Sequence, residues 1–373
     1  MLTLLICLMF ADEMQPLDQV AVQAKAENKL ILVDFYAVWC GPCKLFTRDS
    51  KSDADMKKLL DKVVLAKYDA EKGLGKEIAD SYKVDGYPTF YLLNAELETV
   101  SAMTGYEKGM FSEWVQDNLK DPRTIAAKIA GFEQSPSAPA ALAIAKFRES
   151  ESNYKDALAY YEKAAELDPK TDVAQSSYWC RFMLFKDGEG KAEAVIDAAQ
   201  NLLKTKQDSE TTSFVLSTIS DVSKEAYTDL LKQNYERLSA DKEAQRAASH
   251  FKVDYLLLVE QDKQGAYEAK LANLSDDWQT QPNELNNVAW WCFENNVMLA
   301  EARGYAVKGI ALSEPGRGKA MILDTLAEIE HALGNTGEAI KYMEQAIAED
   351  GASNYYKKQL DRFKKAAQES KSS

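Results

Sequence analysis

The chain has 373 residues, of which 46% are hydrophobic and 28% are charged, with 17 glycines and 9 prolines. This composition is typical of a globular protein with a sizeable core and excludes collagen-like and broadly disordered chains. Its 45 Lys and Arg side chains stand against 59 Asp and Glu, giving a net charge of −14. No broad cationic face is available to neutralise phosphates, so nucleic acid is not an expected partner.

The first eleven residues, MLTLLICLMFA, are apolar and are followed by the acidic Asp12 and Glu13. The run has the length of a signal-peptide core but lacks a basic start. It predicts an export-signal remnant over residues 1–13, and thus a place in the periplasm or cell envelope. A buried first element or a mis-assigned start codon, in a cytoplasmic protein, is the alternative. Beyond this run no apolar stretch approaches the roughly 20 residues of a membrane span, so none is expected in the mature protein.

From residue 16 to about residue 119 the apolar pattern alternates between strand and helix. Apolar runs predict strands at 30–35, 63–68, 89–93 and 99–103. Helical spacing predicts helices at 17–26, after residue 43, at 73–81 and at 108–119. Such alternation with short connections favours a central mixed sheet flanked by helices. We therefore expect an α/β domain over residues 14–120.

The alternation of strands and helices ends at residues 121–139, where prolines that interrupt helices are frequent. This stretch is predicted to be a linker. From residue 140 to residue 370 strand signals vanish, and alanine-rich amphipathic helices follow one another. The basic helix predicted at 354–366 is expected to be a solvated cap of this region, with a binding role as the alternative.

Small residues at regular offsets indicate internal repeats in the helical region. A small, a large and a small residue recur at offsets 0, 4 and 7, as Ala157, Tyr161 and Ala164 and again as Ala339, Met343 and Ala346. This pattern resembles the second helix of a tetratricopeptide repeat, where small residues let two helices pack closely. Weaker copies lie around Ala194 and Ala302, and residues 205–285 predict two or more degenerate helical hairpins. The resemblance implies an all-α helical solenoid.

Only two of the five cysteines, Cys40 and Cys43, are close in sequence. Disulfide exchange needs two sulfurs that can bond each other, an accessible thiolate and a resolving thiol. At the predicted strand-to-helix turn, the pKa of Cys40 should fall below the ordinary value of about 8.5, which makes Cys40 the nucleophile. Cys43, one turn into the helix, is expected to be buried and to resolve the mixed disulfide.

Half of a zinc site is the alternative for these two cysteines. It would need two more ligands at suitable spacing, and the candidates, His250, His331, Cys180 and Cys292, all lie in the helical half. We therefore expect no metal. Cys180 and Cys292 are expected to be buried core thiols, with a regulatory role as the alternative.

The motif VDFYAVWCGPCK at residues 33–44 resembles the active site of thioredoxin, and the resemblance extends over residues 16–119. It implies the thioredoxin fold, a redox-active Cys40–Cys43 pair and no metal or organic cofactor. Asp34 matches the buried acid of that family, which accepts the proton of the resolving thiol, and Lys67 matches the lysine beside it. A solvated edge acid and a surface lysine are the alternatives for these two residues.

The resemblance also implies which residues meet the substrate. Trp39, Gly41 and Pro42 surround the cysteines in the motif, and Tyr87 and Pro88 match the cis-proline loop that faces the sulfurs. The backbone before that proline pairs with an extended substrate strand in the family. An ordinary trans turn is the alternative for Pro88. The Gly-Pro dipeptide between the cysteines is that of thioredoxin and favours a reductase or isomerase over a strong oxidant.

The sequence departs from plain thioredoxin at Arg48, where the family has a helix-kinking proline, and at Tyr87, where it has a smaller residue. With these departures, the sequence is similar to those of exported thioredoxin-like reductases. The substrate and the electron donor therefore stay open. The sequence thus predicts a protein-disulfide reductase or isomerase that uses an upstream thiol reductant. Its repeats would recruit substrate or partner proteins.

Two other functions are compatible with this organisation. The protein could be a chaperone-like holdase whose repeats bind clients, with redox activity secondary. It could also be a scaffold with a vestigial thioredoxin-like domain, but the intact Cys40–Cys43 pair, with Asp34 and Pro88, argues against a vestigial domain.

Overall fold

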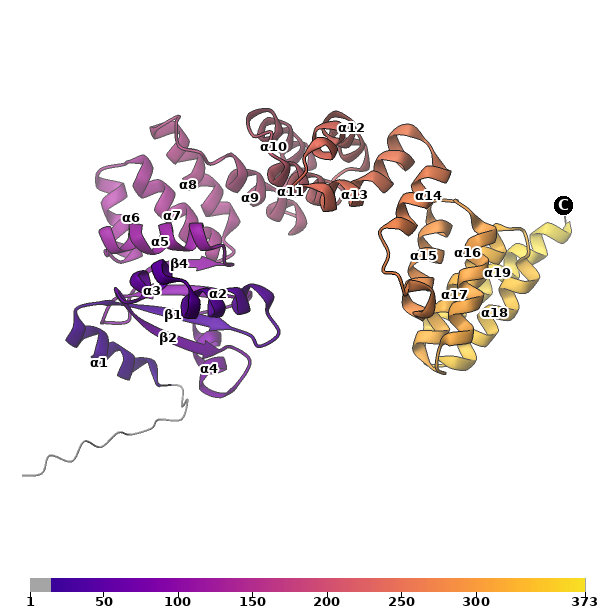
Figure 1. The fold of residues 1–373 in the computed structure, drawn as a ribbon, viewed down its shortest axis with the longest axis horizontal. Coiled ribbons are helices and arrows are strands. Elements are labelled where there is room, and N and C mark those ends of the chain that lie inside the picture. Colours follow the sequence, from indigo (N-terminus) through magenta and orange to yellow (C-terminus); the bar gives the residue numbers. More distant parts are fainter. Residues whose placement is uncertain (1–14, 373) are drawn as a thin grey trace, which may run out of the picture. The chain divides into compact units, whose positions relative to one another are not determined.

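The computed structural model describes residues 15–372, so the predicted export segment lies outside the described residues. The chain divides into two compact units, one ending at Lys204 and the other beginning at Thr205. Figure 1 labels their helices and strands in chain order. Within residues 15–372 no helix combines the length and the apolar character that a membrane crossing requires.

The first unit contains a four-stranded mixed sheet in the order β2-β1-β3-β4. Its strands are β1 (Leu30–Tyr36), β2 (Val63–Asp69), β3 (Thr89–Leu93) and β4 (Thr99–Thr104). Strand β1 runs parallel to β2 and antiparallel to β3, and β4 runs antiparallel to β3 at the edge. All four predicted strands are confirmed.

Helices cover both faces of this sheet, which confirms the predicted α/β class. Helices α1 (Leu17–Glu27) and α4 (Gly73–Ser81) pack on one face. Helices α2 (Gly41–Ser52), α3 (Ala54–Leu60) and α5 (Lys108–Lys120) pack on the other. Helix α3 is not predicted from the apolar pattern of the sequence. This seven-residue helix is started by the Asp53 side chain, which accepts hydrogen bonds from the backbone N–H groups of its first turn.

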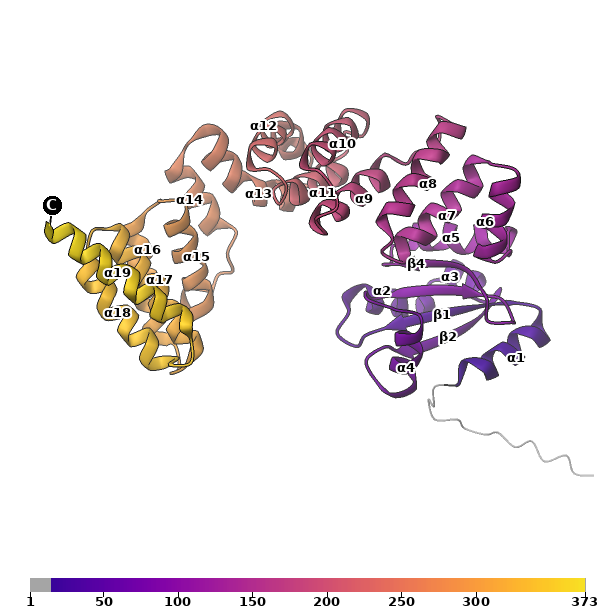
Figure 2. The same cartoon turned by 180° about the vertical axis from the view of Figure 1, so that it is seen from behind.

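Residues 121–139, predicted as a linker, contain α6 (Ile125–Gln134) and the start of α7 (Ala138–Ser150). The proline-rich stretch begins α7 rather than separating domains, because a proline in the first helical turn gives up no needed N–H group. Lys128 of α6 is buried, and its Nζ donates to the Val100 carbonyl at 3.2 Å and to Asn118 Oδ1 at 2.8 Å. Phe147 of α7 belongs to the core of the sheet's α1 face. Helices α6 and α7 are therefore packed directly on the β4 side of the sheet, as Figures 1 and 2 show.

The rest of the first unit consists of α8 (Tyr154–Leu167), α9 (Ala174–Lys186) and α10 (Ala192–Thr205). Ala157 and Ala164 are 0% exposed, in agreement with the close helix packing that the repeat pattern predicts. Helices α7 and α8 pack against each other as an antiparallel pair.

The second unit is helical along its described length. Its α-helices are α11 (Ser209–Ile219), α12 (Lys224–Ala240), α13 (Gln245–Asp254), α14 (Lys263–Ala272), α15 (Pro282–Glu294), α16 (Leu299–Leu312), α17 (Arg317–Ala332), α18 (Thr336–Glu349) and α19 (Asn354–Ser372). A π-helix (Tyr255–Glu260) and a 3-10 helix (Trp278–Thr280) stand between them. Met343 of α18 and Phe363 of α19 share one core cluster, so α19 is packed on the last repeat.

Candidate functional site

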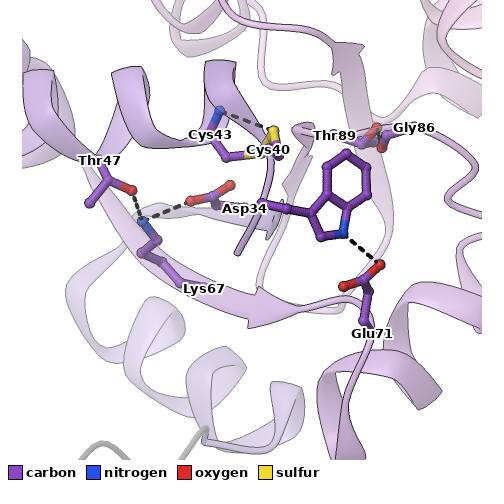
Figure 3. Close-up of a disulfide and its surroundings, with 9 residues drawn as sticks. Asp34, Cys40, Cys43, Thr47, Lys67, Glu71, Gly86 and Thr89 are labelled. Carbon is purple, nitrogen blue, oxygen red and sulfur yellow. Dashed lines mark hydrogen bonds and ion pairs between the residues drawn. A yellow bond between two sulfur atoms is a disulfide. The ribbon is translucent and has the colours of Figure 1, made fainter. Parts of the chain in front are cut away.

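Cys40 and Cys43 form a disulfide at the start of α2 (Figure 3). Cys40 is the residue just before the helix, and its Sγ accepts a hydrogen bond from the backbone N–H of Cys43 at 3.1 Å. Gly41 and Pro42 form the first helical turn, where proline is well tolerated. The Cys40 sulfur therefore lies at the positive end of a helix, which stabilises a thiolate there once the disulfide is reduced.

The two cysteines are equally buried in this disulfide, with Cys40 3% and Cys43 4% exposed. Cys43 is buried, as predicted, and the accessible Cys40 thiolate, which belongs to the reduced state, stays a prediction. In the disulfide each sulfur covers the other, and Ala37, Tyr36 and Tyr87 pack around both. The hydrogen bond at the helix start, rather than exposure, distinguishes Cys40 from Cys43 in this state.

Asp34 of β1 lies directly opposite Lys67 of β2, beside the two cysteines (Figure 3). Asp34 is 1% exposed, and its Oδ2 lies 3.1 Å from Lys67 Nζ. The contact is an ion pair rather than a well-aligned hydrogen bond, since both Asp34 oxygens are buried without a hydrogen-bond partner. Burial raises the pKa of Asp34 above its ordinary value, and the Lys67 charge offsets only part of this effect. Such a carboxyl group can take up and release a proton during thiol exchange.

Lys67 is held in place by its surroundings. Its Nζ donates a hydrogen bond to Thr47 Oγ1 at 3.1 Å and lies 5.4 Å and 5.3 Å from the ring centres of Tyr36 and Phe46. These contacts with α2 and β1 keep the ammonium beside Asp34. Thr47 is not predicted from the sequence, although it stands four residues after Cys43 on the same helical face.

The Tyr87–Pro88 peptide bond is cis, in agreement with the expectation drawn from the resemblance. Thr89 Oγ1 donates to the Gly86 carbonyl at 2.9 Å, and the Gly105 N–H donates to the Pro88 carbonyl at 2.8 Å. Tyr87 packs against the cysteine cluster. The loop is thus fixed on both sides and lies against the disulfide.

An exposed indole stands beside the buried disulfide. Trp39 is 65% exposed, and its Nε1 donates to Glu71 Oε1 at 2.9 Å (Figure 3). Its ring also meets Tyr87 edge to face, with 5.9 Å between ring centres. Glu71 is not predicted from the sequence, although Trp39 and Glu71 follow the carboxyl ends of the parallel strands β1 and β2, which meet at one edge. The arrangement holds an apolar surface in a position to contact another protein.

The remaining described cysteines differ from the pair in α2. Cys180 and Cys292 are free and 0% exposed, and burial raises the pKa of each to about 12. Few thiolates form at neutral pH with such a pKa, so neither cysteine is suited to exchange. Within residues 15–372, no group of three or more His, Cys, Asp and Glu is placed to hold a metal ion.

Two family models match segments of the chain. The thioredoxin family model matches residues 17–117, and a tetratricopeptide-repeat model matches residues 138–171 and 322–353. The chain therefore contains a thioredoxin domain and carries tetratricopeptide repeats. Asp34, the cysteine pair and the cis proline all lie inside the thioredoxin match.

Individual relatives resemble the thioredoxin domain. Thioredoxin-1 of Drosophila melanogaster is 46% identical over 68 residues, which are 18% of this chain and 60% of that protein. Protein disulfide isomerase-like 2-2 of Oryza sativa subsp. japonica is 51% identical over 63 residues, 17% of this chain and 16% of that protein. The crystal structure of the germline-specific thioredoxin Deadhead from Drosophila is 31% identical, with a TM-score of 0.24, and the match covers 29% of this chain and 98% of that one. The chain thus matches less than two thirds of the length of these two curated relatives.

Proposed function

We propose that the protein is a thiol-disulfide oxidoreductase that acts on disulfides of other proteins through Cys40 and Cys43. The observation that carries this proposal is the position of the pair. The disulfide begins helix α2, its first sulfur accepts a helix N-terminal hydrogen bond, and the cis-proline loop lies against it. Relatives named as thioredoxin and as protein disulfide isomerase support the same chemistry.

The exchange uses the dithiol as its redox group and needs no metal or organic cofactor. The Cys40 thiolate attacks one sulfur of the substrate disulfide, forms a mixed disulfide and displaces the other substrate sulfur as a thiolate, which is then protonated. The Cys43 thiol passes its proton to the Asp34 carboxylate and attacks Cys40, which releases the second substrate thiol. The substrate disulfide gains two electrons, and the Cys40–Cys43 dithiol loses two as it becomes a disulfide. An upstream thiol reductant restores the dithiol.

Reduction is the direction that we propose as the main one. The Gly41-Pro42 pair between the cysteines matches thioredoxin, whose potential near −270 mV makes it a reductant. Isomerisation uses the same mixed disulfide but returns Cys40 without loss of electrons from the protein. The tetratricopeptide repeats support a second part of the proposal, in which they recruit substrate or partner proteins.

Two assays test these proposals. Reduction is measured with insulin as the substrate and dithiothreitol as the reductant, and isomerisation is measured as the recovery of activity by scrambled ribonuclease without added reductant. We expect faster insulin reduction with the wild type and none above background with Cys40→Ser. Equal rates with these two proteins would contradict the proposal, and strong ribonuclease recovery with weak insulin reduction would replace reduction by isomerisation.

A further inference from the structure

A groove of about 620 Å³ lies where the first repeat packs on the thioredoxin domain, within the first unit. Its volume falls in the range of about 300–1,000 Å³ that is typical of ligand pockets. One wall comes from β4, the start of α5 and the loop before β3, and the other comes from α7, α8 and α9. We call it the β4–α7 groove. It uses neither the cysteines nor the Asp34–Lys67 pair.

The groove is continuous with the loop that faces the disulfide. Asp85 and Gly105 line it, and the Gly105 N–H is bonded to the carbonyl of the cis proline at 2.8 Å. Ser152, in the turn between α7 and α8, also lines the groove and donates to Asp85 Oδ2 at 3.1 Å. Asp85 is two residues before Tyr87, so their Cα atoms are at most about 7 Å apart. A polypeptide that pairs with the loop at Tyr87 therefore passes the entrance of the groove within a few residues of its cysteine.

The walls combine apolar and acidic side chains. Met103, Met110, Trp114 and Trp179 supply the apolar part, and Met110 is 63% exposed. Met side chains adapt to varied apolar partners, which suits a site that accepts several sequences.

Charged side chains of the lining favour a cationic ligand. The exposed carboxylates of Asp85 and Glu113 stand against the single exposed ammonium of Lys146. Glu149 is more deeply placed, and its carboxylate accepts a 2.5 Å hydrogen bond from Tyr161 while burial raises its pKa. The outer charges therefore sum to a negative value, so a Lys or Arg side chain complements the groove and an acidic one does not.

We propose that the β4–α7 groove binds the segment of a protein substrate that flanks its reacting cysteine, and that it selects segments in which an apolar side chain stands close to a Lys or Arg. The inference rests on the proposed exchange at Cys40. The first repeat thus acts as part of the substrate-binding surface of the thioredoxin domain. Selection occurs in the mixed-disulfide step, when Cys40 holds the substrate cysteine in front of the cis-proline loop.

The test uses three short peptides with one central cysteine in a mixed disulfide with 2-nitro-5-thiobenzoate. The first has Leu and Lys on both sides of the cysteine, the second has Leu and Glu, and the third has Ala and Lys. The reduced full chain attacks the peptide sulfur, because thiobenzoate is the better leaving group, and its coloured thiolate is released. Each rate constant is divided by the rate constant of the same peptide with dithiothreitol, which removes differences in intrinsic reactivity.

We expect the wild type to prefer the Leu-Lys peptide about tenfold over the Leu-Glu peptide and about fivefold over the Ala-Lys peptide. Glu113→Lys should reduce the first preference about fivefold. The matched control is Asp117→Lys, which makes the same change of net charge on an exposed position of α5 outside the groove. It should change the preference less than twofold.

Equal rates for the Leu-Lys and Leu-Glu peptides with the wild type would overturn the inference, as would equal effects of Glu113→Lys and Asp117→Lys. The second result would mean that the overall negative charge, rather than the groove, attracts the cationic peptide. Failure of the underlying exchange gives a different result. In that case the wild type and Cys40→Ser would release thiobenzoate from all three peptides at the same rate.

Discussion

Lys67 Nζ lies 3.1 Å from Asp34 Oδ2, in an ion pair whose acid is 1% exposed while the lysine side chain is 33% exposed. The lysine keeps contact with water, whereas the carboxylate loses almost all of its hydration. Because of this asymmetry, burial outweighs the attraction of Lys67, and the pKa of Asp34 is raised. The acid beside the disulfide is therefore costly to fold in its charged form and well placed to accept a proton.

Asp34→Asn should stabilise the oxidised protein at pH 7 by about 1–2 kcal/mol. The pKa of Asp34 is higher in the folded chain than its ordinary value of 3.8, so the unfolded chain gives up this proton first as pH rises. The free energy of unfolding of the wild type therefore decreases as pH rises between these two pKa values. Asparagine does not titrate, so the variant does not show this decrease. Urea unfolding at pH 7 and pH 3 checks this prediction, with the gain present at pH 7 and absent at pH 3. A less stable variant at pH 7 would contradict it.

The same substitution should slow insulin reduction about tenfold or more at neutral pH, because the resolving thiol loses its proton acceptor. Lys67→Met keeps the acceptor but removes the charge that lowers the pKa of Asp34. The rate of Lys67→Met should therefore increase with pH as Asp34 ionises, and this increase should occur at a higher pH than in the wild type. Asp34→Asn should show no such increase. Single-turnover rates across a pH series separate the variants, and superimposable profiles would rule out a proton transfer through Asp34.

Glu71→Ala should raise the KM for insulin about three- to tenfold and leave kcat close to that of the wild type. The substitution removes the acceptor that fixes the exposed Trp39 indole at 2.9 Å. Glu71→Gln is the matched control, since its amide oxygen can accept the same hydrogen bond. An equal loss in the two variants would show that the charge of Glu71 matters instead.

Ala157→Leu should destabilise the first unit by about 1–3 kcal/mol, because Ala157 is 0% exposed where α8 meets its neighbours. Ala159→Leu adds the same side chain at an exposed position of the same helix and should change stability by less than about 0.5 kcal/mol. Chemical denaturation measures both. Equal stabilities would contradict the close packing in this repeat.

The sequence predicts the sheet well because its strands are short apolar runs, and Asp34 is the one interruption in the first of them. The segment that contains α6 and the start of α7 is harder to predict. Proline is a stop signal inside a helix but a start signal in its first turn, and only the packing of Lys128 and Phe147 on the sheet shows that this stretch is part of the first unit.

The candidate site is predictable where its residues share one motif or one strand pairing. Cys40, Cys43 and Asp34 lie within ten residues of each other, and Lys67 follows from the resemblance. Thr47 and Glu71 contribute through single hydrogen bonds to other site residues, which leave no periodic pattern.

The β4–α7 groove could not be predicted, because it exists only where α7 packs on β4 and α8 and α9 follow it in the first unit. Its lining residues come from separate stretches between residues 85 and 179.

The most direct test of the central claim is the identity of the cysteine that attacks a substrate. Reduced Cys43→Ser is mixed with insulin, quenched with acid and analysed by intact mass and peptide mapping, with Cys40→Ser treated in the same way. The account predicts a covalent adduct at Cys40 in the first variant, released by dithiothreitol, and little or no adduct in the second. An adduct that forms faster at Cys43 in the Cys40→Ser variant, or no adduct in either, would contradict it.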